Sequence, residues 1–125
     1  MNSIQLISVF VGGGLGSLCR FGISKYISSQ NFFIEWPVAT LLANMFSCIV
    51  MGLMVYLGLK MELSDHLKTF VLVGFCGGFS TFSTFSMETL LLMRSGGFLW
   101  ATGNVLISVV ACITILFLLT SGDKL

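Results

Sequence analysis

Four long apolar runs, separated by short polar pieces, decide most of what this chain can fold into. They cover residues 4–24, 38–59, 69–93 and 98–120. A helix that crosses a bilayer needs about 20 mostly apolar residues, and each run is that long. Lipid admits only helices and closed barrels as spanning structures, and runs of this length match helices. The sequence therefore predicts an all-α integral membrane protein with four transmembrane helices in one domain, residues 1–125.

Composition and charge support this class and exclude others. Charged residues make up 9% of the chain, whereas soluble domains use about a quarter. A net charge of +1 gives no reason to expect a nucleic-acid partner. No basic segment precedes the first run, so we interpret it as a retained span and not as a signal peptide. The single histidine, His66, has no cysteine or carboxylate partner at membrane depth, so an enzyme is not expected.

Cysteine spacing argues against disulfides and zinc. The four cysteines fall inside the apolar runs, at Cys19, Cys48, Cys76 and Cys112. They have no CxxC spacing and no nearby histidine, which zinc sites require. We therefore interpret them as small apolar packing residues.

Basic residues are divided evenly between the two sides of the membrane. With four spans, one side holds Lys60, Lys68 and Lys124, and the other holds Arg20, Lys25 and Arg94. Orientation follows the Lys/Arg asymmetry of the loops, so this chain has almost no preferred orientation. It could insert both ways up and assemble as an antiparallel, dual-topology homodimer. The same balance also arises by chance in a short chain with few charges.

Glycines mark two places of special backbone geometry. In the first run Gly12 and Gly16 form a GxxxG pair, which predicts a close helix crossing. In the third run Gly77 and Gly78 predict a break, because each glycine costs a helix interior roughly 1 kcal/mol. A break frees carbonyls that can bind a cation, as in discontinuous transporter helices. In an antiparallel dimer two such breaks could meet and hold one dehydrated cation; a kink filled by neighbouring side chains is the alternative.

Aromatic rings and hydroxyl groups crowd the stretch that follows this glycine pair. Phe79, Phe82 and Phe85 recur every three residues, and hydroxyls lie among and after them at Ser80, Thr81, Ser83, Thr84 and Ser86. Stripes of rings are usually packing, and such hydroxyls can bond to their own helix. Five hydroxyls within seven residues still exceed what the repair of a kink requires. This stretch is therefore a candidate binding site.

Polar residues on other spans could complete such a site. Asn44 lies inside the second run, while Asn104, Ser108 and Cys112 are spaced four apart in the fourth and share a face. They could be interhelical hydrogen bonds or could line a wet path. The deep cation is Arg20, so a path of hydroxyls, amides and positive ring edges favours an anion.

Three stretches together give a specific family resemblance. "GFCGGFSTFSTFSMET" (residues 74–89), with "GGGLGSLCRF" and "PVATLLAN", closely resembles the Fluc (CrcB) fluoride channels over essentially the whole chain. The resemblance implies passive export of cytoplasmic fluoride across the bacterial inner membrane. It also implies an antiparallel dual-topology homodimer with two fluoride pores and a structural sodium ion at its centre.

Matching the family motifs residue by residue implies particular roles. Fluoride would meet the ring edges of Phe82 and Phe85, beside Asn44, Ser83 and Thr84, with Ser108 on the fourth-span polar face. Sodium would bind the backbone carbonyls of Gly77 and Ser80, and Arg20 would stand near the vestibule. Four positions depart from the commonest pattern: Ala39 for glycine, Ser80 for threonine, Asn104 for tyrosine, and Cys112 for a hydroxyl residue.

Two other functions remain to be weighed. A proton-coupled small multidrug-type exporter is also short and four-spanning, but it needs a carboxylate within the membrane. The spans offer Glu88, near the end of the third run. A purely structural membrane protein would use Phe82, Phe85 and Asn44 for stability alone.

Overall fold

The computed structural model of the chain describes residues 2–30 and 36–122. These residues contain helices and no strand. In order they are α1 (Ser3–Ser29), α2 (Val38–Lys60), α3 (Asp65–Lys68), the π-helix η1 (Thr69–Phe75), α4 (Cys76–Phe79), α5 (Phe82–Arg94) and α6 (Phe98–Thr120). Four helical segments are long and apolar enough to cross a membrane. Three are the single helices α1, α2 and α6, and the other is the stretch Asp65–Arg94, in which α3, η1, α4 and α5 follow one another. The predicted all-α membrane fold is confirmed; Lys124, used in the charge count, lies outside the described residues.

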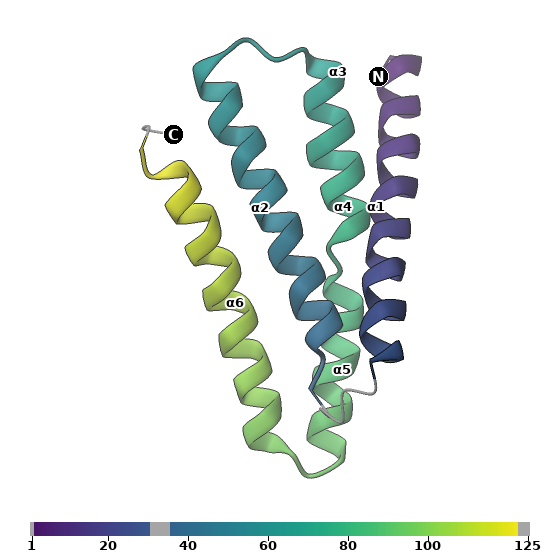
Figure 1. Cartoon of the computed structure of the whole chain (residues 1–125), viewed down its shortest axis with the longest axis vertical. Helices are drawn as coiled ribbons and strands as arrows, with labels where there is room; N and C mark the ends of the chain where they lie inside the picture. Colours follow the sequence, from purple (N-terminus) through teal and green to yellow (C-terminus); the bar gives the residue numbers. More distant parts are fainter. Residues whose placement is uncertain (1, 31–35, 123–125) are drawn as a thin grey trace.

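The third span is divided between two neighbours (Figure 1). Its first half, η1 and α4, packs along α1, whereas its second half, α5, packs against the start of α6. Helix α2 lies between these elements and contacts α6 along its length. The junction between α4 and α5 therefore faces α2. At this junction the neighbour of the third span changes from α1 to α6.

Close packing of α1 against the third span depends on glycine. A Cβ atom built at Gly16 would collide with the backbone carbonyl of Phe75, and one at Gly78 would collide with that of Gly13. Glycine is needed at both places because no side chain fits between two backbones this close. The close crossing predicted from the GxxxG pair is confirmed, and Gly78 is part of it.

The third span is broken, but two residues later than the sequence predicted. Gly77 and Gly78 remain helical inside α4, and the extended residues are Ser80 (ψ 157°) and Thr81 (φ −151°, ψ 117°). Thr81 is the N-cap of α5, and its side chain accepts a hydrogen bond from the Thr84 N–H at 3.2 Å. A threonine hydroxyl at this position satisfies an amide that a new helix would leave unpaired. The cap fixes where the break falls, and Gly78, of the glycine pair, serves contact with α1.

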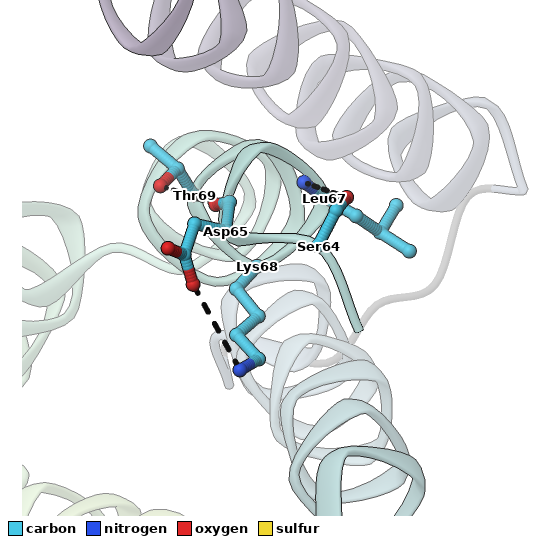
Figure 2. A network of polar contacts seen from close by, with 5 residues as sticks. All are labelled: Ser64, Asp65, Leu67, Lys68 and Thr69. Carbon is cyan, nitrogen blue, oxygen red and sulfur yellow. Dashed lines mark hydrogen bonds and ion pairs between the residues drawn. The ribbon is translucent and has the colours of Figure 1, made fainter. Parts of the chain in front are cut away.

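The helices also begin and end differently from the predicted runs. Helix α1 continues to Ser29, and the third span begins at Asp65 because Ser64 caps it. Figure 2 shows this cap: the Leu67 N–H donates to Ser64 Oγ at 3.3 Å, and Lys68 Nζ lies 4.0 Å from an Asp65 carboxylate oxygen. Caps of this kind extend a span into the polar boundary, where hydropathy gives no signal.

Candidate functional site

A cavity of about 260 Å³ lies beside the break in the third span. Its walls come from α2, from the α4–α5 junction, from α5 and from α6. The lining residues are Asn44, Cys48, Ser80, Thr81, Phe82, Phe85, Ser108, Val109 and Cys112. The fold thus brings together four residues that the sequence predicted for one path: Asn44, Phe82, Phe85 and Ser108.

Asn44 clamps the break from the neighbouring helix. Its Oδ1 accepts the Thr81 N–H at 2.8 Å, and its Nδ2 donates to the Thr81 carbonyl at 3.4 Å. The side chain therefore replaces the helical acceptor that the Thr81 N–H has lost, and it also donates to the Thr81 carbonyl. An asparagine amide carries two donor hydrogens, so one remains for the cavity. Asn44 can stabilise the broken backbone and donate to a bound anion together.

The two phenyl rings stand on the first turn of α5. Their centroids are 5.8 Å apart and their planes are inclined at 40°. Phe82 is 80% exposed in the single chain, while Phe85 is half-buried. Ring edges carry partial positive charge, so a pair in this arrangement can present C–H groups to an anion. The exposure of Phe82 leaves one side of the cavity for lipid or for another chain.

The hydroxyls of Ser83 and Thr84 are grouped around the N-cap and do not line the cavity. Thr81 Oγ1 donates to Thr84 Oγ1 at 3.0 Å and lies 3.4 Å from Ser83 Oγ. Both Ser83 and Thr84 are exposed. Their expected place beside fluoride stays a prediction, because the cavity of the single chain does not include them.

The fourth-span polar face has two different uses. Asn104 is 1% exposed, donates to Thr89 Oγ1 at 2.8 Å and accepts from Ser108 Oγ at 3.4 Å. It is thus an interhelical link between α5 and α6. Ser108 and Cys112, one and two turns further along, line the cavity. The hydrogen-bonding alternative is confirmed for Asn104, and a wet path along Ser108 and Cys112 stays a prediction.

The break separates the carbonyls of residues 77–80 from the amide partners of a continuous helix, and the two predicted sodium ligands, Gly77 and Ser80, are among them. In a continuous α-helix the Gly77 carbonyl would accept from the Thr81 N–H, and the Ser80 carbonyl from the Thr84 N–H. The Thr81 N–H donates instead to Asn44, and the Thr84 N–H donates to the Thr81 hydroxyl. Gly77 is exposed, with nothing within 4 Å of where a Cβ would stand. The binding of sodium to these two carbonyls stays a prediction.

Arg20 and Glu88, the charged residues inside the four apolar runs, lie away from this cavity. Arg20 is half-exposed on α1, and no described residue forms an ion pair with it. Glu88 Oε1 accepts from Thr40 Oγ1 at 2.8 Å, while its Oε2 is buried without a hydrogen-bond partner in the described part of the chain. Glu88 lines a second cavity, of about 380 Å³, with Trp36, Pro37, Leu91, Leu92 and Ser95. The vestibule role of Arg20 stays a prediction.

Sequence reasoning counted Thr81 among the hydroxyls of the candidate stretch but missed its role as a cap, and it missed Cys48 as part of this site. Thr81 is 8% exposed and joins the cap, the Asn44 clamp and the cavity wall. Its signal was available: a threonine three residues before another hydroxyl residue, after an apolar turn, resembles an N-cap. Cys48 lies one helical turn after Asn44, and that spacing places both on one face.

The fold and the site define a class of protein. The chain has four helices that can span a membrane, and three of these spans wall a small cavity with an amide, hydroxyls, thiols and phenyl rings. Such weak, neutral ligands suit the passage of a small ion and offer no nucleophile paired with a base. This is a multi-pass membrane protein of the transport type.

Comparison with known proteins identifies the family. The profile of the family described as "CrcB-like protein, Camphor Resistance (CrcB)" matches residues 7–120. The fluoride-specific ion channel FluC of Pyrococcus abyssi is 40% identical over 119 residues, covering 94% of each chain. Its namesake from Shewanella pealeana is 39% identical over 118 residues, covering 94% of this chain and 93% of that protein. The FluC of Serratia proteamaculans is 38% identical over 105 residues, covering 83% and 81%. The chain therefore belongs to the CrcB family.

Family membership confirms two expectations. The relatives are named ion channels, so the expectation that the chain is not an enzyme holds. The spanning helices and these relatives also make it a multi-pass protein of the bacterial membrane.

Proposed function

We propose that this chain is a fluoride-specific ion channel through which cytoplasmic fluoride leaves the cell down its gradient. The observation that carries the proposal is the cavity where Phe82, Phe85, Asn44 and Ser108 meet. The names of the relatives support the choice of fluoride. A small anion that loses water there would gain an amide hydrogen, a hydroxyl and two ring edges.

These ligands suit conduction because each is weak. A fixed cation in the path would hold fluoride too tightly, whereas neutral donors and ring edges let it enter and leave. The low dielectric of the surroundings strengthens each of these contacts relative to water. Arg20, on α1, would raise the local anion concentration near the mouth without binding in the cavity itself.

The working unit would be an antiparallel, dual-topology homodimer with two pores. The exposed face of Phe82 leaves the cavity open on one side, where a second copy can complete it. The described basic residues divide as Lys60 and Lys68 on one side and Arg20, Lys25 and Arg94 on the other. In such a dimer Ser83 and Thr84, exposed in one chain, could line a pore shared with the partner.

A structural sodium ion would link the two copies. The freed carbonyls of Gly77 and Ser80 are hard oxygen ligands, which suit a hard cation, and two chains would supply four of them. When bound, sodium would supply positive charge at the dimer centre and pair these carbonyls. Replacing sodium by N-methyl-D-glucamine in all buffers should lower the melting temperature of the dimer. An unchanged melting temperature would argue against this site.

Flux from liposomes tests the channel proposal directly. Purified protein in liposomes loaded with fluoride and chloride should release fluoride and retain chloride, as read by ion-selective electrodes. Phe82→Ile should abolish fluoride release because an aliphatic chain has no positive edge. Phe117→Ile is the matched control, since Phe117 is also an exposed phenylalanine but lies on α6 outside the cavity. Equal release of both anions, or release that survives Phe82→Ile, would contradict the proposal.

One observation favours a second function, the proton-coupled exporter. Glu88 has a buried, unpaired carboxylate oxygen beside a cavity of its own. Exchange of a proton for a cationic substrate would use such a group. This function requires that a transmembrane pH gradient drive uptake of a cationic dye and that Glu88→Gln abolish it. Dye uptake that is absent, or indifferent to Glu88→Gln, would remove this alternative.

A further inference from the structure

Two thiols form one end of the cavity wall. Cys48 lies one turn after Asn44 on α2, and Cys112 lies one turn after Ser108 on α6. The two helices pack side by side (Figure 1). Both thiols are free, and both residues line the same cavity. The wall thus has a polar layer of amide and hydroxyl beside a layer that holds two thiols.

The other two cysteines do not share this environment. Cys76 is fully buried, and its Sγ donates to the Ser47 carbonyl at 3.7 Å. Cys19 is exposed on α1 and lines neither cavity. Among the four cysteines, only Cys48 and Cys112 line this cavity. Packing alone explains Cys76, but it does not require two half-exposed thiols on the wall of one cavity.

We propose that Cys48 and Cys112 form a two-coordinate binding site for a soft d¹⁰ metal ion, such as Hg(II) or Cu(I). Thiolate is the ligand that soft metal ions prefer. No group of three or more histidine, cysteine or acidic side chains gathers within residues 2–30 and 36–122, so zinc-like tetrahedral sites have no ligands here. Two thiols on one cavity wall can supply the two ligands that Hg(II) and Cu(I) accept.

Binding requires no oxidant. Hg²⁺ and two thiols give S–Hg–S and two protons, and each sulfur keeps its oxidation state. With Hg(II) the two thiolate charges balance the metal charge, so the complex is neutral. Its effect on the cavity is therefore steric: a metal atom at the wall, one turn from Asn44 and Ser108, narrows a space of about 260 Å³. On the proposed function, on which this consequence rests, the metal blocks fluoride flux.

A direct binding measurement tests the site without relying on transport. Cys19→Ser removes the exposed thiol and serves as the reference protein. Titration with HgCl₂ should give ultraviolet sulfur-to-mercury charge-transfer absorption that saturates at one Hg(II) per chain. A monothiol competitor should remove the metal at least tenfold more easily after a further Cys48→Ser or Cys112→Ser. Equal retention in these variants, or two independent Hg(II) ions per chain, would overturn the proposal. Cys48→Ala and Cys112→Ala replace any serine variant that fails to elute as folded protein.

Fluoride efflux then separates this inference from the proposed function. HgCl₂ should stop efflux through the Cys19→Ser protein, and dithiothreitol should restore it. Efflux through the further Cys48→Ser variant, at whatever rate it has without metal, should be the same with and without HgCl₂. Efflux that continues at full rate with the site saturated would overturn the blocking effect. A protein that binds Hg(II) at the pair in the titration, but releases no fluoride in the absence of HgCl₂, would support the metal site and overturn the channel function.

Discussion

At the scale of single residues, Asn44 has two roles, one in holding the broken backbone and one in lining the cavity. It clamps the Thr81 backbone through both its acceptor and one donor, and it lines the cavity with the other. Hydrogen bonds to a broken backbone within the membrane are costly to lose, because no water replaces them. Stability and conduction should therefore fail together when this side chain is shortened.

Asn44→Ala should leave the Thr81 N–H, in a residue that is 8% exposed, without a partner. An unsatisfied buried amide costs about 1–3 kcal/mol, so thermal unfolding in detergent should occur at lower temperature and fluoride efflux should fall. Thr102→Ala is the matched control, because the Thr102 hydroxyl bonds only to the Phe98 carbonyl of its own helix on an exposed face. Wild-type unfolding of Asn44→Ala would mean that the clamp does not hold the break.

At the scale of elements, the third span separates what sequence can predict from what it cannot. The length and hydropathy of the span predicted a helix, and its glycines and hydroxyls predicted a break. The position of the break depends on Asn44, more than thirty residues away, and on the Thr81 cap. Gly78 remains helical because it packs against the α1 backbone, which is a contact between distant segments. The π-helix Thr69–Phe75 was also unpredicted, because nothing in an apolar run distinguishes its hydrogen bonds from those of an α-helix.

The crossing of α1 over the third span gives a sharp test at this scale. Gly16→Ala places a methyl group against the Phe75 carbonyl and the Phe79 N–H, so the two backbones must separate. Forced overpacking costs about 1–3 kcal/mol, and the melting temperature should fall accordingly. Gly22→Ala on the same helix meets nothing within 4 Å and should unfold like wild type. If both variants melt alike, the close approach of these helices is not what holds them.

At the scale of the whole molecule, the even division of charge is the feature with the widest consequence. Orientation follows the Lys/Arg balance of short loops, so a few added cations should fix it. Met61→Lys with Glu62→Lys adds two cations beyond α2, whereas Gln30→Lys with Ser95→Lys adds two on the opposite side. These positions are all exposed, which keeps the packing intact. Each double variant should then insert one way up.

Dual topology makes a distinctive prediction for these two double variants. If the working unit is antiparallel, each one expressed alone lacks oppositely oriented partners, and its fluoride efflux should fall at least tenfold below wild type. Co-expression supplies both orientations and should restore efflux together with a mixed dimer, detected by purifying through a tag on one variant. Neutral controls with glutamine at the same positions, or serine at position 30, should behave as wild type. Full efflux from either oriented variant alone would mean that parallel chains suffice, and the cavity would then have to be completed by a different face.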